Sequence, residues 1–339
     1  MNWRLLILLL LNAFVCNSVT FAQDQLPYIY YYSPELNAMI VERADGTDTR
    51  VFGQGMNIPT FGPGFSPNGD WFASSAGENV EGSSSILSVR GTTVLRQLLD
   101  LSNVWYMDWS SNSRYILVSG SFDSCVAACR YITSLMINVE ENDLVAAAHF
   151  LPSYGGPRTR PIEWSQDNES VSFYMIEDLY SPSGAATFQV TMYSSGDVIK
   201  HSTPYEEYDL ANPPIDESSP IRIEIEHISP DGRYSISAYH DFTDRVTGAV
   251  TELPKPEFPE GADVNQVMHA QWDASGQWVM LGYGQSASGF WGLAIMRADG
   301  SEFRTLNYSL CRTRLGGACA GWLPDNVDVD SIPLLTDAP

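Results

Sequence analysis

Short runs of alternating or β-branched residues fill this chain of 339 residues, and most of them are bounded by turn signals. A phrase made of an aromatic or apolar residue, a turn and such a run appears as "FSPNGDWFASS" from Phe65 and returns as "ISPDGRYSISAYH" from Ile228. Alternation with a period of two is typical of strands, because successive side chains point to opposite faces of a sheet. In the turns, proline presets φ, and glycine or asparagine accepts a positive φ. Each phrase therefore predicts a strand, a tight turn and a second strand.

Six copies of this phrase align, and they begin at the marker residues Phe65, Trp109, Trp164, Ile228, Trp272 and Trp322. A second hairpin follows in most copies, as in "AMIVERADGTDTRVFG" and "LAIMRADGSEFRTLN", where an Asp-Gly turn joins two apolar runs. Four strands in each repeat of about 40–60 residues is typical of a β-propeller blade. The chain starts in mid-copy and ends with a lone first strand in "GACAGWLPDN". We therefore expect an all-β, six-bladed β-propeller with four-stranded blades, its sixth blade closed by both termini.

The "SPDG"-type turn and its following strand, paired with the "ADG" hairpin, resemble the six-bladed TolB-type propeller repeat. They are also similar to the propeller domains of prolyl oligopeptidase-like proteins. The resemblance covers residues 28–326 and implies the propeller fold, but no single activity, because unrelated functions occur on propellers. TolB carries a separate α/β domain before its propeller, for which only Gln23–Pro27 are available here, and no length is spare for a peptidase domain.

The first residues, "MNWRLLILLLLNAFVCNSVTFA", combine one arginine with an apolar core and small residues before "QDQ". This pattern predicts a secretory signal peptide over 1–22. Its apolar core is short for a membrane span, and no later segment is apolar enough to be one. We expect an extracytoplasmic protein, periplasmic or secreted, with one propeller domain over 23–330 and an acidic C-terminal tail over 331–339.

The net charge of the mature chain is strongly negative. Without Arg4 the 18 basic side chains fall to 17 against 41 acidic ones, a net charge of −24. Such a charge repels phosphate backbones and anionic lipids, which argues against nucleic-acid and membrane partners. It is compatible with solubility outside the cytoplasm, with a cationic partner or with a divalent ion.

Four cysteines follow the signal peptide as two close pairs, Cys125 with Cys129 and Cys311 with Cys319. An even number in an exported chain predicts disulfides, and two local bridges are the simplest of three pairings. Helical residues four positions apart hold their Cβ atoms too far apart for a bridge, so we expect a non-helical loop at 125–129.

One residue before each marker stands a column that reads Gly64, Asp108, Glu163, His227, Gln271 and Gly321. First strands line the central channel of a propeller, so the four polar members are candidate ligands of a divalent cation. Carboxylate oxygens suit calcium, and the imidazole favours zinc or manganese. A water-filled channel with hydrated walls is the simpler interpretation, and the marker aromatics are interpreted as wedges between blades.

The string "DNVDVD" (325–330) lacks the glycine and final glutamate of a calcium loop and is interpreted as an acidic, disordered tail.

Two insertions rich in proline and glutamate, 201–220 and 252–263, carry three aromatic residues, Tyr205, Tyr208 and Phe258. These could form the rim of a site for a basic or amphipathic partner, although a solvated loop is the simpler interpretation.

The first functional hypothesis is a monomeric, non-catalytic binding or scaffold module that engages a protein, a peptide or a glycan through one loop-rich face. The face with the second-to-third strand loops and the blade connections is favoured, because both cysteine pairs and residues 201–220 map to it. The alternative is a metal-dependent, lactonase-like hydrolase that uses Asp108, Glu163 and His227. The sequence contains no nucleophile elbow, phosphate loop or zinc motif that would indicate another class of enzyme.

Overall fold

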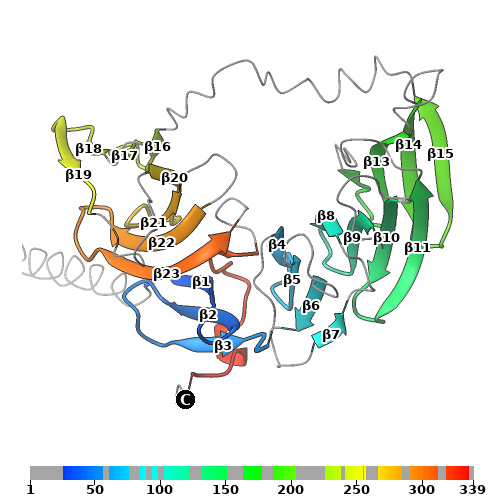
Figure 1. Cartoon of the computed structure of the whole chain (residues 1–339), viewed down its shortest axis with the longest axis horizontal. Coiled ribbons are helices and arrows are strands. Elements are labelled where there is room, and N and C mark those ends of the chain that lie inside the picture. The colour runs from blue at the N-terminus through cyan, green and yellow to red at the C-terminus, as the bar shows by residue number, and fades with distance from the viewer. Residues whose placement is uncertain are drawn as a thin grey trace, which may run out of the picture.

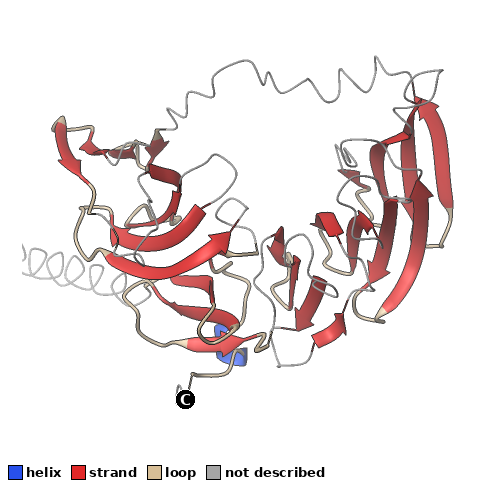
Figure 2. Cartoon of the chain, viewed as in Figure 1, coloured by secondary structure: helices blue, strands red, loops and turns tan. Residues whose placement is uncertain are grey.

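The computed structural model describes residues 26–55, 61–75, 84–88, 94–97, 103–121, 132–150, 163–177, 186–203, 226–237, 241–254, 256, 266–284, 290–311 and 318–335. Within them the chain forms twenty-four β-strands and one short 3-10 helix, η1 (Val329–Ser331). The strands make six four-stranded antiparallel sheets, as Figure 2 shows in red. The predicted all-β fold of four-stranded sheets is confirmed.

The first three sheets contain the N-terminal half of the chain and the last strand. Sheet 1 consists of β24 (Ala320–Trp322), β1 (Tyr28–Ser33), β2 (Ala38–Arg43) and β3 (Arg50–Phe52). Sheet 2 consists of β4 (Phe61–Phe65), β5 (Trp71–Ser75), β6 (Ser84–Ser88) and β7 (Val94–Gln97). Sheet 3 consists of β8 (Asn103–Trp109), β9 (Tyr115–Ser121), β10 (Ile132–Asn138) and β11 (Asp143–Phe150).

The remaining sheets follow in chain order. Sheet 4 consists of β12 (Glu163–Trp164), β13 (Ser170–Glu177), β14 (Ala186–Tyr193) and β15 (Val198–Thr203). Sheet 5 consists of β16 (His227–Ile228), β17 (Tyr234–Ile236), β18 (Asp241–Asp244) and β19 (Ala249–Glu252). Sheet 6 consists of β20 (Gln266–Trp272), β21 (Trp278–Gly284), β22 (Phe290–Arg297) and β23 (Arg304–Cys311).

The repeated phrase forms the first two strands of each sheet, as predicted. Every first strand ends at its marker residue. The tight turns then place one residue in the left-handed region, with φ between 61° and 77°, at Gly69, Ser113, Asn168, Gly232 and Gly276. The side chain that opens each turn caps it; the Ser66 hydroxyl, for example, accepts a hydrogen bond from the Trp71 amide at 3.1 Å. The turn chemistry read from the sequence therefore accounts for the local geometry.

Sheet 1 is assembled from both ends of the described chain. β1 pairs with β24 through three opposed residue pairs, and its other edge pairs with β2. The first strand of this sheet thus comes from the C-terminal side and its other three strands from the N-terminal side. Pairing of this kind covers an edge of β1 that would otherwise be open to other chains.

Five apolar clusters join neighbouring sheets in the order 4, 3, 2, 1, 6 and 5. The marker aromatics take part in these clusters, which confirms their interpretation as wedges. No cluster joins sheet 4 to sheet 5 within the described residues. In Figure 1 the sheets follow an open arc, with sheet 4 (green) at one end and sheet 5 (yellow) at the other. The arrangement is therefore that of consecutive propeller-like sheets, and a closed ring is not seen.

Residues 325–335 form a packed segment, which corrects the expectation of a disordered tail at 325–330. Val327 and Ile332 are buried against the aromatic cluster between sheets 1 and 2. Beyond η1 the chain runs beside β3, where the Val51 amide donates to the Pro333 carbonyl and the Leu335 amide donates to the Thr49 carbonyl. The sequence pattern did not indicate this packing, because the apolar residues that anchor the segment stand singly between acidic residues.

Candidate functional site

A tryptophan at the end of a first strand reaches the preceding sheet at four junctions. The four hydrogen bonds run from the indole Nε1 of Trp109 to the Gly64 carbonyl (3.2 Å), Trp164 to Asp108 Oδ2 (3.0 Å), Trp272 to the His227 carbonyl (3.3 Å) and Trp322 to the Gln271 carbonyl (3.0 Å). All four acceptors belong to the column that the sequence offers as channel residues. Each such bond contributes about 0.5–1.5 kcal/mol net, and each one also fixes the spacing of two sheets.

The two junctions without a tryptophan differ from each other. Between sheets 1 and 2 the marker is Phe65, whose ring packs against those of Tyr30, Phe52 and Phe72 with centroids 4.9–5.7 Å away. Between sheets 4 and 5 the marker is Ile228, which is 44% exposed. Aromatic packing therefore replaces the indole bond at the first of these junctions and does not do so at the second.

The carboxylates of the column occupy different environments. Asp108 on β8 is half-buried, and burial raises the pKa of its carboxyl against the opposing effect of the Trp164 indole bond. Glu163 on β12 is exposed, at the position equivalent to Asp108 in the next sheet. Asp108 thus serves the junction between sheets 3 and 4, whereas Glu163 lies at the end of the arc.

The other two polar column residues belong to sheets 5 and 6. Burial, with a smaller contribution from the charge of His269, lowers the pKa of His227 to about 4, so this imidazole is neutral at pH 7. Gln271 has a buried side-chain oxygen without a hydrogen-bond partner. Within the described residues no three His, Cys, Asp or Glu side chains form a group that could hold a metal ion. The four polar column residues thus lie on four different sheets, and three of them, Asp108, His227 and Gln271, accept indole bonds from a neighbouring sheet.

Sheet 4 has one apolar face and one polar face. The apolar face packs on sheet 3 and carries Val171, Phe173, Met175, Val190 and Met192. The opposite face points away from sheet 3, toward the open end of the arc. We call it the polar face of sheet 4, and its members are Glu163, Ser172, Tyr174, Gln189, Thr191, Tyr193, Ile199 and His201.

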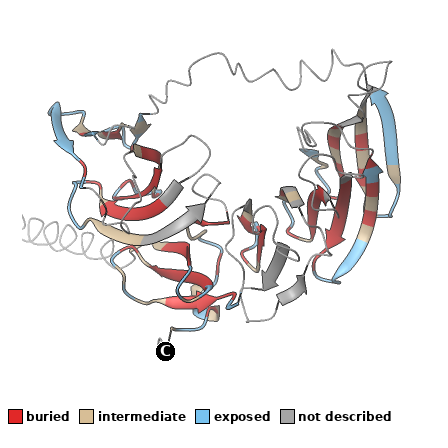
Figure 3. Cartoon of the chain, viewed as in Figure 1, coloured by how far each residue is buried: buried red, intermediate tan, exposed pale blue. Residues whose placement is uncertain are grey.

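Cross-strand register organises this polar face into rows. Ser172 lies opposite Thr191, and their hydroxyl oxygens are 2.9 Å apart. Tyr174 lies opposite Gln189, which in turn lies opposite His201 on β15. All members of the face are partly or fully exposed, as the tan and pale blue parts of this sheet in Figure 3 indicate. Hydroxyl, phenol, amide and imidazole groups therefore share one surface.

The side of sheet 5 that turns away from sheet 6 mixes polar and apolar side chains: Ser235 is buried and Val250 is 62% exposed. Ile236 and Phe242 pack toward sheet 6, while Ser235, Thr243 and Val250 form one cross-strand row on the other side. By contrast, sheet 6 buries apolar side chains on both of its faces, with Met280 toward sheet 1 and Leu281 toward sheet 5. No apolar cluster of the described residues joins the two sheets at the ends of the arc, and we call the region between them the polar seam.

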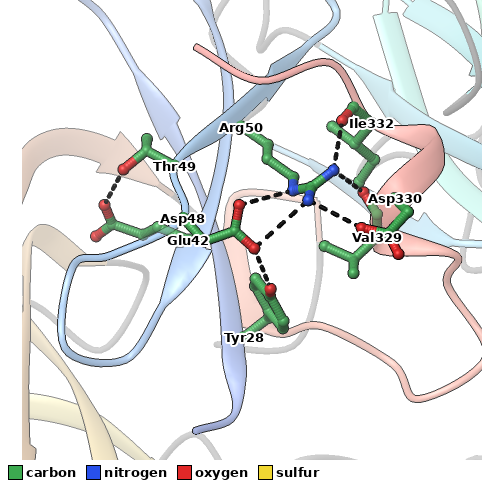
Figure 4. A network of polar contacts seen from close by, with 8 residues as sticks. All are labelled: Tyr28, Glu42, Asp48, Thr49, Arg50, Val329, Asp330 and Ile332. Carbon is green, nitrogen blue, oxygen red and sulfur yellow. Dashed lines mark hydrogen bonds and ion pairs between the residues drawn. The ribbon is translucent and has the colours of Figure 1, made fainter. Parts of the chain in front are cut away.

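Arg50 at the start of β3 fastens the C-terminal segment (Figure 4). Its guanidinium donates to the Val329 and Ile332 carbonyls at 2.8 and 3.0 Å and to Asp330 at 2.9 Å. It also pairs with Asp48 at 3.1 Å. A bond from the Tyr28 hydroxyl, together with Arg50, holds the pKa of Asp48 below its usual range.

A surface pocket of about 410 Å³ lies beside Arg50 and is lined by residues 330–334. The Arg50 guanidinium beside this pocket is already bonded to the Val329 and Ile332 carbonyls and to Asp330. We call the contacts of Arg50 with the C-terminal segment the C-terminal clasp.

Several candidate residues lie outside the described part of the chain: Tyr205, Tyr208, Phe258, Cys125 and Cys129. The side chain of Cys311 at the end of β23 is also outside it. Cys319 is buried and disulfide-bonded. The pairing of Cys319 with Cys311 stays a prediction, as do the second bridge and the aromatic rim.

The sequence pattern missed the polar face. Its signal is the strict alternation in "SVSFYM" (170–175), whereas "YILVS" (115–119) and "WVML" (278–281) are apolar at nearly every position. Alternation indicates a strand with one solvated face, and continuous apolar runs indicate strands buried on both faces. No helix in the described part of the chain is long and apolar enough to cross a membrane.

No protein-family model matches the sequence, and no curated protein matches it. Among solved structures the chain is similar to TolB from Acinetobacter baumannii, with 14% identity, a TM-score of 0.37, and coverage of 92% of this chain and 70% of that one. It is similar to a candidate 6-phosphogluconolactonase from Bacteroides fragilis, with 10% identity, a TM-score of 0.40, and coverage of 89% and 99%. It is also similar to the β-propeller domain of the Trilobed protease from Pyrococcus furiosus, with 14% identity, a TM-score of 0.34, and coverage of 83% and 79%.

The structures similar to this chain thus include TolB and a protease propeller, the two groups that its repeats resemble. With identities of 10–14% and TM-scores of 0.40 or less, these are distant resemblances. The functional proposals below therefore rest on the side chains of this protein.

Proposed function

We propose that this chain is an exported, monomeric, non-catalytic propeller that binds a protein or peptide partner through one end of its sheets. In this proposal residues 1–22 are a signal peptide, and the six sheets are six blades. Sheets 4 and 5 face each other across the polar seam, and the exported cysteines pair as Cys125–Cys129 and Cys311–Cys319. The partner binds at the end that carries the second-to-third strand loops and the connections between sheets.

The observation that carries this proposal is the difference between the two ends of the sheets. At one end the tight turns bond to one another: the Asn68 amide donates to the Ser113 hydroxyl at 2.8 Å, and the Ser111 amide donates to the Asn168 side chain at 2.8 Å. Asn326 reaches the Pro67 carbonyl in the same way. Polar groups at this end are used within the protein, which leaves few for a partner.

Connections at the other end are longer. The strand bounds leave residues 76–83, 122–131, 178–185 and 204–226 to join strands or sheets there. Long connections on a rigid scaffold are the usual place for partner contacts. This asymmetry supports the choice of the loop-rich end.

Charge indicates the chemistry of the partner. Five arginines in the described residues are paired with carboxylates: Arg50, Arg114, Arg233, Arg297 and Arg304. In the whole chain 41 acidic side chains stand against 18 basic ones, so acidic groups far outnumber the cations that could pair with them. A partner with a basic surface would associate faster and more tightly at low salt.

Site-specific photocrosslinking tests this proposal. A photoreactive amino acid replaces Glu35, exposed in the β1–β2 turn at the loop-rich end, or Ala274, exposed in a tight turn at the other end. In an extract of the compartment to which the protein is exported, we expect a discrete adduct from position 35 that excess unlabelled protein competes away and high salt weakens. Equal adducts from both positions, or none from position 35, would contradict the proposal.

The metal-dependent hydrolase stays a prediction from the sequence, and no described contact favours it. A chelator should leave the melting temperature of the mature protein unchanged, and lactone and ester substrates should not be turned over. A stoichiometric bound ion with a clear drop in melting temperature on chelation would favour the hydrolase instead.

A further inference from the structure

We propose that the outer edge of β19, the last strand of sheet 5, is a docking site for an extended peptide segment of a partner protein, with a basic residue at the N-terminal end of that segment. The segment adds to sheet 5 as a further, antiparallel strand. This site lies on the rim of the molecule and binds through backbone groups, so it goes beyond the loop-rich end proposed above. It stays open when sheet 4 lies across the polar seam, because neighbouring blades meet through their faces and not through their outer edges.

The outer edge of β19 is open along the whole strand. β19 pairs with β18 on one side, and within the described residues no strand pairs with its other side. Its four residues are all exposed, as the pale blue arrow in Figure 3 shows, and these include Val250 and Thr251, which point to opposite faces of the sheet. Alternate N–H and C=O groups of an edge strand point outward. β19 therefore offers backbone donors and acceptors to an incoming strand.

The molecule already contains one strand addition of this kind. The outer strand of sheet 1, β3, is buried, and its outer edge is covered by residues 333–335. The Val51 amide donates to the Pro333 carbonyl at 2.9 Å, and Arg50 and Leu334 form an antiparallel bridge. An outer strand of this fold can thus accept an extended segment through its main chain. Addition of a peptide strand to an open sheet edge is also a general mode of recognition between proteins.

The remaining outer strands carry features that discourage a further strand. The pairings of β7, β11 and β23 with their neighbours are interrupted by register shifts, and β15 carries Lys200. Bulges and lysines are the usual means by which proteins protect an edge. β19 pairs with β18 without a shift and contains neither lysine nor proline. These comparisons single out β19 among the outer strands of the six sheets.

Charge indicates the kind of residue that the incoming segment carries. Asp241 and Glu252 lie directly opposite each other at one end of the β18–β19 hairpin, and both are exposed. Like charges in opposed positions destabilise a pair of strands, so a cation placed beside them is favourable. The turn at the other end carries Arg245, which disfavours a second cation there. In an antiparallel addition the N-terminal end of the segment lies beside Glu252, and the basic residue belongs at that end.

The experiment titrates the mature, full-length protein with a fluorescein-labelled peptide whose core is Lys-Val-Thr-Val-Thr and follows the fluorescence anisotropy. One control peptide has glutamate in place of the lysine, and a second is N-methylated throughout its core, which removes its backbone donors. We expect saturable binding of the lysine peptide that weakens as salt is raised, and much weaker binding of both controls. Hydrogen exchange should slow at the amides of β19 and stay unchanged at those of β15.

Three substitutions locate the binding on the protein. Val250→Lys should weaken binding of the lysine peptide about fivefold, because its ammonium lies near that of the peptide. Val246→Lys is the matched control, since Val246 is 76% exposed in the β18–β19 turn, outside the paired strands. It adds the same charge and should bind like the wild type. Asp241→Asn should weaken binding about threefold and reduce its dependence on salt.

Urea unfolding of each variant shows whether the fold is kept, and the two control peptides test the proposal on the unaltered protein. The absence of saturable binding of the lysine peptide would overturn the proposal. Equal binding of the glutamate or the N-methylated peptide, or exchange that slows elsewhere and not at β19, would overturn it as well. The crosslinking test of the loop-rich end is independent of these outcomes.

Discussion

The two faces of sheet 4 lie back to back on the same four strands, and they differ in every contact they make. Toward sheet 3 the sheet buries Phe173 and Met175, and Trp164 adds an indole bond to Asp108. Toward sheet 5 the alternate residues Ser172 and Tyr174 are partly exposed. Neither an apolar cluster nor an indole bond joins sheets 4 and 5 within the described residues. One face is committed to the hydrophobic core, and the other is polar and partly exposed.

Although the strands repeat from sheet to sheet, the contacts between neighbouring sheets are not equivalent. Each repeat keeps its turn because the turn is a local device of a few residues. A junction depends on side chains from two repeats. Having isoleucine at marker position 228, where four other markers are tryptophan, therefore alters one junction and leaves the strands intact. Replacing apolar by polar residues on facing sheets then removes the hydrophobic contribution to that junction, about 25 cal/mol per Å² of apolar area.

Alanine substitutions of two adjacent residues of β13, Phe173 and Tyr174, should differ most in their cost in free energy of unfolding. Phe173→Ala should lower the free energy of unfolding by about 3–5 kcal/mol, because it leaves a cavity in a fully buried cluster. Tyr174→Ala should lower it by less than about 1 kcal/mol, because that side chain is partly exposed. Urea unfolding measures both values. Equal costs would mean that the polar face is buried in solution and that the comparison fails.

The second prediction concerns substitutions of the marker residues at two junctions, Trp272 and Ile228. Trp272→Phe should cost about 1–2 kcal/mol, since it leaves the His227 carbonyl without its indole donor. In the closed six-blade arrangement proposed above, an indole at position 228 would reach Glu163 as Trp164 reaches Asp108, so Ile228→Trp should raise stability by about 0.5–1 kcal/mol. Thermal unfolding of both variants tests this. An unchanged Ile228→Trp variant would indicate that sheets 4 and 5 do not approach each other.

A smaller effect concerns pH and His227. Its pKa is about 4 in the folded protein, against an ordinary value of 6.5 for histidine, so between these values the unfolded chain binds a proton that the native state does not. Stability should therefore fall as the pH drops from 6.5 to 4. His227→Gln should remove this part of the dependence, a difference of a few degrees in melting temperature across the window. Parallel melting curves for both proteins would contradict the neutral, buried imidazole.

The smallest effect compares two carboxylates of the same column. The folded-state pKa of Asp108 is raised by burial, so the ionised group reduces stability above that pKa. Asp108→Asn keeps an oxygen for the Trp164 indole and should stabilise the protein at pH 7 by less than about 1 kcal/mol, because the carboxyl is partly solvated. The gain should vanish at low pH. Glu163→Gln should change nothing at either pH, and a large loss from either variant would instead point to a bound cation.

Much of the fold could be predicted from the sequence, because its signals are local. The markers, the turns with positive φ at Gly69 and Gly232, and the strand that closes sheet 1 all follow from short-range pattern. The closure of the sheets into a ring could not be read in the same way, because it depends on contacts between side chains in different repeats. The packed C-terminal segment was missed because Arg50, its main partner, lies about 280 residues away in the sequence.

The candidate site was less predictable than the fold. Aligning the first strands correctly brought Asp108, His227 and Gln271 into one register, yet register does not reveal that their oxygens accept indole bonds from the next sheet. The polar face of sheet 4 could have been found from the alternation at 170–175. Its significance appears only when the neighbouring strands are known to be apolar on both faces.

The C-terminal clasp also bears on the order of events during synthesis. β1, β2 and β3 leave the ribosome among the first strands, while β24 and the partners of Arg50 leave last. Sheet 1 therefore lacks β24, and β1 keeps an open edge, until residues 320–322 have been made. Removal of residues 320–339 would take away β24 and the clasp together and leave that edge exposed to proteases. The clasp thus ties the completion of sheet 1 to the synthesis of residues 320–332.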